Sequence, residues 1–178
     1  MRRRGSRWLA VTASSLLVAC ASLTPPYGAG DRLLSGRLSV RVDSDPPRAL
    51  SAAFELSGDA GTGALVLTSP LGSTLAQAHW TPTEAVLETP GSSRSYPDLD
   101  ALAEHALGER VPLAALFDWL RGRPWPDSPS QRLPGDERGF TQLGWRVTLP
   151  HDAQGWVQAQ RAAAPAVTMR ARLDPATP

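Results

Sequence analysis

Short runs in which apolar and polar residues alternate recur along most of the chain, and they restrict its fold more than any other feature. In residues 37–42, arginine and serine alternate with leucine and valine, the pattern of a strand with one buried face. Similar runs, each bounded by turn-forming residues, follow at 52–56, 65–67, 74–80, 85–87, 145–149 and 167–173. This spacing predicts a meandering antiparallel sheet and a mainly β fold of the α+β class. Because residues 65–67 are apolar on both faces, we expect helices to cover one side of the sheet.

The middle of the chain carries two helix signals. Asp98 suits the N-cap of a helix that ends at Gly108 and keeps its leucines and alanines on one side. Pro112 suits the first turn of a second helix, in which apolar residues recur at i, i+3, i+4 and i+7 before a stop at Gly122. The following residues, 123–139, are rich in proline and charge, and we predict that they form a long surface loop.

The first nineteen residues have the composition of an export signal. Four arginines precede a short apolar stretch that ends in small residues and is too short to span a membrane, so we predict a signal peptide at 1–19. The only cysteine, Cys20, follows at once, and residues 17–20 (Leu-Val-Ala-Cys) resemble the lipobox of bacterial lipoproteins. In a lipobox the cysteine sulfur receives a diacylglycerol, and the leader is cut before that residue. The alternatives are a plain signal peptide and a buried structural cysteine. The position at the cleavage point and the lack of a disulfide partner favour lipidation of Cys20.

Loss of the leader changes the charge of the chain. It removes four arginines and no acidic residue, so the formal net charge falls from +1 to −3. The remaining arginines are scattered and do not form a stripe with aromatic residues, which argues against nucleic-acid binding. Residues 20–31 are small, polar and interrupted by proline and glycine, as in a lipidated N-terminus with a flexible tether. Residues 32–178 show no internal repeat, and we predict that they form a single domain.

One predicted turn carries an apolar residue at its tip. Pro70 and Gly72 fit a tight turn between two strand-like runs, and Leu71 lies between them. From spacing alone, the favoured interpretations are that Leu71 folds back onto the sheet or is an ordinary exposed leucine.

Residues that perform catalysis or bind metal ions form no recognisable pattern. The chain lacks a Gly-x-Ser-x-Gly elbow and a phosphate-binding glycine loop. The spacing of His79, His105 and His151 matches no metal site. The acidic pairs at 98 and 100 and at 136 and 137 suit a helix start and a solvated loop. We therefore expect neither an enzyme nor a protein that depends on a metal or cofactor.

Four segments, in order along the chain, resemble the outer-membrane lipoprotein LolB family. They are residues 35–41, 65–74, 112–122 and 144–147. The most specific are the Pro-Leu-Gly hairpin around Leu71 and the helix that ends in Trp-Leu-Arg-Gly at Gly122. The resemblance implies a half-open antiparallel β-barrel whose helices cover an apolar cavity, as in LolA and LolB.

The resemblance also implies a function. Members of this family are lipid-anchored at the periplasmic face of the outer membrane, accept lipoproteins from the soluble periplasmic carrier LolA and insert them into that membrane. The leucine at the hairpin tip serves membrane targeting and insertion in this family, and the matching residue is Leu71. The resemblance therefore reverses the interpretation of Leu71 from spacing alone.

Alternation and helical spacing indicate which side chains would line such a cavity. We predict nine of them: Phe54, Leu56, Leu65, Leu67, Trp80, Leu116, Trp119, Leu120 and Trp145. For each of them, plain core packing explains the pattern equally well. We expect a monomer whose partners are LolA, acylated lipoprotein cargo and outer-membrane phospholipid. The alternative is a structural or assembly lipoprotein that binds a protein partner and no lipid.

Overall fold

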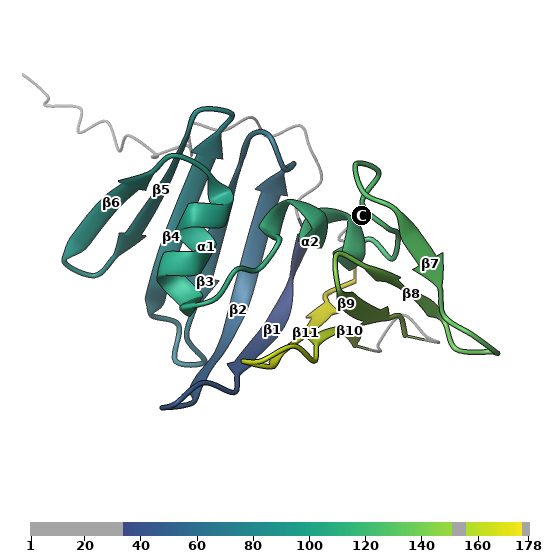
Figure 1. Ribbon diagram of the computed structural model, residues 1–178. Coiled ribbons are helices and arrows are strands. Elements are labelled where there is room, and N and C mark those ends of the chain that lie inside the picture. The colour runs from purple at the N-terminus through teal and green to yellow at the C-terminus, as the bar shows by residue number, and fades with distance from the viewer. Residues whose placement is uncertain (1–33, 151–155, 176–178) are drawn as a thin grey trace, which may run out of the picture.

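The predicted mainly β fold is confirmed by a computed structural model, which describes residues 34–150 and 156–175 (Figure 1). Within these residues the elements are β1 (Leu34–Val42), β2 (Arg48–Gly58), β3 (Gly63–Thr68), β4 (Thr74–Thr81), β5 (Glu84–Thr89), β6 (Ser92–Tyr96), α1 (Leu99–Leu107), α2 (Leu113–Leu120), β7 (Ser130–Arg132), β8 (Gly139–Gln142), β9 (Trp145–Thr148), β10 (Val157–Arg161) and β11 (Val167–Leu173). The predicted signal peptide, Cys20, the tether and His151 lie outside the described residues.

All eleven strands of the described residues belong to one antiparallel sheet that does not close. Its order is β6-β5-β4-β3-β2-β1-β11-β10-β9-β8-β7, so β6 and β7 are the two edges. Strands β1 and β11 are neighbours although they are far apart in the sequence. Their close approach requires a glycine at position 36, because a Cβ atom there would lie 2.1 Å from the carbonyl oxygen of Arg172. Both helices lie on one face of the curved sheet (Figure 1). The architecture is therefore an open barrel with helices over its inner face.

The alternation in the sequence becomes a difference in burial between the two faces of the strands. Val40 and Val42 are buried in β1, whereas Arg37 and Arg41 are exposed. The same pattern runs along β2, where Phe54 and its neighbours at 52 and 56 are buried between exposed residues. These strands were predicted because each buries one face.

Four strands were not predicted. Strand β6 was missed because its residues are polar and show no alternation. A polar strand suits its place at the edge of the sheet, where little of it is buried. Strand β7 falls inside residues 123–139, so the prediction of a long loop there was wrong in part. The same segment also contains Leu133, which is buried. Strands β8 and β10 each carry a single large apolar residue, Phe140 and Val157, so no alternation of large apolar residues marks them.

Both helices follow their sequence signals. The Asp98 side chain accepts a hydrogen bond of 2.7 Å from the backbone N–H of Ala101, and Gly108 ends α1 in the left-handed conformation with φ 75°. Helix α2 begins after Pro112, and Gly122 follows its end with φ 76°. Among the residues that the structure describes, no helix combines the length and the hydropathy needed to cross a bilayer.

Candidate functional site

An apolar cavity of about 460 Å³ lies between the inner face of the sheet and the two helices. Strands β1 to β5, β10 and β11 contribute to its wall, and α1 and α2 cover it. Apart from the tryptophan indoles, the lining residues with polar side chains are Ser39, Thr89, His105 and Arg170. Most of the wall therefore offers packing surface without hydrogen-bond partners, which suits a hydrocarbon ligand.

The two indole N–H groups in this wall are already bonded within the protein. Trp80 Nε1 donates to the carbonyl oxygen of Asp59 at 2.8 Å, and Trp119 Nε1 donates to the side-chain oxygen of Gln142 at 2.8 Å. Both rings therefore present carbon surface to the cavity without leaving a buried donor unpaired.

Eight of the nine side chains predicted to line a cavity do lie in its wall. They are Phe54, Leu56, Leu65, Leu67, Trp80, Leu116, Trp119 and Leu120. The ninth, Trp145, does not line it. Its ring centroid lies 5.9 Å from that of Trp119, in the adjoining core, because hairpin β8–β9 packs behind α2. Alternation places Trp145 on the inner face but does not reveal that another tryptophan separates it from the cavity.

Sequence reasoning missed other wall residues. Leu75, Leu87, Val157 and Met169 also line the cavity. Leu87 and Met169 lie on predicted strands, and their alternation was the signal that could have found them. Val157 is the one large apolar residue of β10, so no alternation marked that strand.

A buried glutamine supports the back of the cavity. Gln142 is only 2% exposed, and its side-chain oxygen accepts hydrogen bonds from Trp119 Nε1 and, at 2.9 Å, from the backbone N–H of Trp125. Its amide nitrogen donates to the carbonyl oxygens of Trp125 and Ser128, both at 2.7 Å. One side chain therefore fixes a ring of the cavity wall and the segment that follows α2.

The hairpin between β3 and β4 holds Leu71 away from the protein. The backbone N–H of Ser69 donates to the carbonyl oxygen of Ser73 at 2.8 Å, and that of Gly72 donates to the carbonyl oxygen of Ser69 at 2.9 Å. Gly72 has φ 85°, which a residue with a side chain rarely adopts. Leu71 is 94% exposed. The interpretation that Leu71 folds back onto the sheet is therefore wrong.

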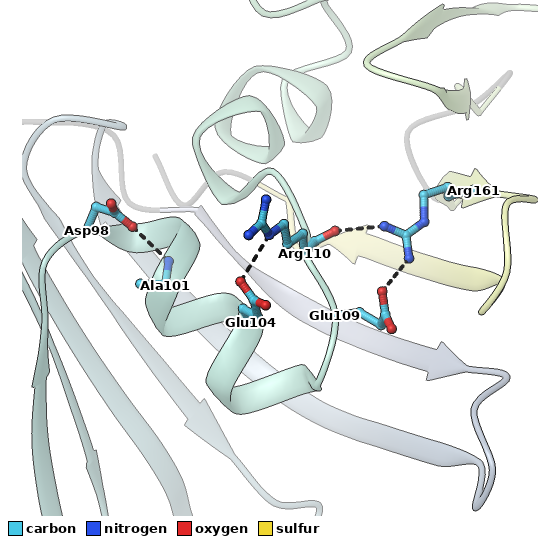
Figure 2. A network of polar contacts seen from close by, with 6 residues as sticks. All are labelled: Asp98, Ala101, Glu104, Glu109, Arg110 and Arg161. Carbon is cyan, nitrogen blue, oxygen red and sulfur yellow. Dashed lines mark hydrogen bonds and ion pairs between the residues drawn. The ribbon is translucent and has the colours of Figure 1, made fainter.

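The connection between the helices is tied to the opposite part of the sheet (Figure 2). Arg161 on β10 donates to the carboxylate of Glu109 at 2.8 Å and to the carbonyl oxygen of Arg110 at 3.0 Å. Its guanidinium also lies 5.6 Å from the ring centroid of Trp145. Both side chains of the ion pair are about four-fifths buried. This contact holds the helical cover against β10.

Truncation of the Arg161 side chain should destabilise the fold. We expect Arg161→Ala to lower the free energy of unfolding by roughly 1–3 kcal/mol, because it leaves Glu109 largely buried without its partner. Urea unfolding followed by tryptophan fluorescence measures the change. The matched control is Arg110→Ala, since the Arg110 side chain is 82% exposed and its ion-pair partner Glu104 is itself 53% exposed. It should cost less than about 1 kcal/mol. Equal losses in the two variants would contradict the role given to Arg161.

The other polar residues considered in the sequence take structural positions. His79 lies on β4 and His105 on α1, while Asp98 caps α1. Burial, followed by the charge of Asp98, raises the pKa of Asp100 above its usual value. Glu137 forms an ion pair with Arg146. Within the described residues, no three side chains of His, Cys, Asp and Glu form a group that could hold a metal ion.

Comparison with known proteins identifies the family of the chain. A model of the family described as "Outer membrane lipoprotein LolB" matches residues 32–173. A protein named outer-membrane lipoprotein LolB from Cupriavidus metallidurans is 33% identical over 98% of this chain and 89% of its own length. Proteins of the same name from Bordetella petrii and Bordetella pertussis are 37% and 40% identical, over 83% and 84% of this chain and 80% and 82% of their own lengths. The chain therefore belongs to the LolB family of outer-membrane lipoproteins.

Proposed function

We propose that this protein accepts lipoproteins from the periplasmic carrier LolA, holds their acyl chains in the apolar cavity and inserts them into the outer membrane. The observation that carries the proposal is the cavity of about 460 Å³, whose wall is almost entirely aliphatic and aromatic. Acyl chains offer bulk and no hydrogen-bonding groups, so they suit a wall of this kind. The eight predicted residues that line the cavity are the proposed acyl contacts.

Transfer from the carrier without an energy source requires a difference in affinity. The cavity must hold the acyl chains more tightly than the carrier does, and ~1.4 kcal/mol corresponds to a tenfold preference. Apolar burial supplies roughly 25 cal/mol per Å², so a modest increase in enclosed acyl surface is enough. The handover then proceeds down a gradient of affinity.

Two residues have separate proposed roles at the membrane. Cys20 carries the lipid anchor after the signal peptide at 1–19 is removed, and residues 20–31 tether the domain formed by 32–178. Leu71 contacts phospholipid during release, because a 94% exposed leucine on an ordered turn has no packing role within the protein. Burial of one leucine yields only roughly 1.5–3 kcal/mol, which suits repeated shallow contact and not permanent attachment. We propose that the protein acts as a monomer.

Capture of cargo tests the cavity. The mature chain with Cys20→Ala is incubated with lipoprotein-loaded carrier, and native mass spectrometry measures the cargo bound to each protein. We expect Leu67→Trp to reduce captured cargo roughly five- to tenfold, because the larger ring occupies space that the acyl chains need. The matched control is Val66→Trp, which adds a similar bulk to the same strand at a residue outside the cavity wall.

Two results would count against the proposal. Unchanged capture by a folded Leu67→Trp protein would separate the cavity from acyl binding. Persistent absence of cargo on the unsubstituted chain, under conditions in which the carrier is loaded, would favour a structural lipoprotein that binds only a protein partner.

A further inference from the structure

A second, smaller pocket of about 250 Å³ adjoins the apolar cavity between β5, β6 and α1. Its lining residues are Leu87, Thr89, Ser92, Arg94, Tyr96 and His105. Leu87, Thr89 and His105 also line the apolar cavity, so the two spaces share one wall. The wall of the apolar cavity is almost entirely apolar, whereas five of the six residues that line the smaller pocket carry a polar group. The cavity and the pocket together could bind an amphiphile, with its hydrocarbon chains in the cavity and its polar head group in the pocket.

Arg94 is directed into this pocket by the strand register. It pairs with Leu87 across β5 and β6, and paired residues on adjacent antiparallel strands point to the same face of the sheet. Leu87 lines the apolar cavity, so the Arg94 guanidinium belongs to the inner face. None of the described residues that line the pocket is acidic. The pocket therefore presents a positive charge to a ligand that carries oxygen acceptors.

The buried hydroxyl of Tyr96 is an independent indication that the pocket binds a ligand. The oxygen of this hydroxyl is buried, and no hydrogen-bond partner for it exists among the residues that the structure describes. A buried hydroxyl without a partner is unfavourable, and such groups in folded proteins call for an explanation. The Tyr96 ring is held in place by His105, with 5.3 Å between the ring centroids. Because the hydroxyl has no surface open to water, a ligand oxygen in the pocket becomes its partner only when side chains of the pocket wall move aside.

We propose that this pocket binds the oxygen-bearing group from which the acyl chains of a bound lipid extend, while the chains themselves occupy the apolar cavity. The inference rests on the proposed acyl-binding function and adds a head-group site to it. Arg94 and Tyr96 donate hydrogen bonds to carbonyl or phosphate oxygens. Those oxygens are the ester and amide carbonyls of an acylated lipoprotein N-terminus, or the phosphate of a phospholipid.

Binding of three ligands by the mature chain with Cys20→Ala tests this site. They are a triacylated cysteinyl peptide, dioctanoyl phosphatidylglycerol and dodecane, which has chains but no head, and isothermal titration measures each affinity. We expect Tyr96→Phe and Arg94→Gln each to weaken binding of a head-bearing ligand roughly three- to tenfold, the usual effect of one lost hydrogen bond. Both variants should bind dodecane with an affinity within about twofold of that of the unsubstituted chain. Arg132→Gln, on the opposite edge strand β7, is the matched control and should change none of the three.

The pattern of losses identifies the head group. Loss for the peptide alone assigns the site to cargo, loss for phosphatidylglycerol alone assigns it to phospholipid phosphate, and loss for both assigns it to oxygens common to the two. Unchanged affinity for both head-bearing ligands, or an equal loss for dodecane, overturns the inference and leaves the acyl cavity intact. Failure of the unsubstituted chain to bind dodecane overturns the acyl cavity and the head-group site together.

Arg94 also has a competing structural explanation. An inward-pointing charge on an edge strand discourages pairing with another sheet edge. If Arg94→Gln increases self-association in sedimentation velocity and leaves all three affinities unchanged, edge protection is its role and the head-group inference is wrong.

Discussion

Replacement of Leu71 with glutamate is expected to reduce delivery of cargo to liposomes by roughly 10- to 100-fold. The contact that a single leucine makes with lipid is worth roughly 1.5–3 kcal/mol, and its loss lowers the population of membrane-bound protein by that factor. The fold should survive, because Leu71 is 94% exposed and the turn is held by backbone hydrogen bonds. The measurement is transfer of lipoprotein from the cargo-loaded mature chain with Cys20→Ala to liposomes, as a rate.

The chain offers a matched control for this change. Leu143 is the other large exposed hydrophobic residue among those described, at 43% exposure, and it lies in the turn between β8 and β9. Leu143→Glu introduces the same charge at a different hairpin and should leave delivery within about twofold of normal, since we assign it no lipid contact. Capture from the carrier should be normal in both variants. If Leu71→Glu delivers cargo as fast as the unsubstituted protein, the role proposed for Leu71 is wrong.

Replacement of Gln142 with leucine is expected to lower the free energy of unfolding by roughly 3–5 kcal/mol. Leucine has a similar volume but no polar atoms, so the indole N–H of Trp119, the backbone N–H and carbonyl of Trp125 and the carbonyl of Ser128 all lose a partner. Each unpaired buried group carries a desolvation penalty. Urea unfolding followed by circular dichroism measures the change.

An exposed glutamine provides a control, because it shows what a Gln→Leu substitution costs when no buried hydrogen bond is lost. Gln131 lies on the edge strand β7 and is exposed, so Gln131→Leu should change the free energy of unfolding by no more than about 0.5 kcal/mol. A loss below about 1 kcal/mol for Gln142→Leu would mean that the four groups find other partners. The segment after α2 would then not depend on this side chain.

The same glutamine links stability to the cavity. Trp119 is fully buried and forms part of the cavity wall, while its ring centroid lies 6.4 Å from that of Phe140 and 5.9 Å from that of Trp145. The hydrogen bond to Gln142 fixes the ring that these aromatic contacts surround. An apolar cavity needs a rigid wall, because a side chain free to rotate would fill the space meant for a ligand. We therefore expect substitutions at Gln142 to affect acyl capture as well as stability.

Strands with one buried face and helices with clear caps were predictable from the sequence because their signals are local. Val40 and Val42 alternate with arginines over a few residues, and Asp98 lies three residues before the N–H group that it binds. The tip position of Leu71 follows from Pro70 and Gly72 in the same way. Strands β6 and β7 were missed because edge strands carry little alternation.

By itself, the sequence determined the class of fold, the inward direction of the nine side chains predicted to line a cavity and the hairpin that carries Leu71, because each depends on neighbours within a few positions. Only the tertiary structure decided which inward residues border the cavity and which pack against another side chain. Trp119 and Trp145 have equally apolar surroundings in the sequence, yet one lines the cavity and the other lies behind it. The partners of Gln142 and the pocket around Tyr96 likewise depend on segments far apart in the chain. Such contacts form only when the helices and the segment after α2 pack against the sheet, which depends on the whole core.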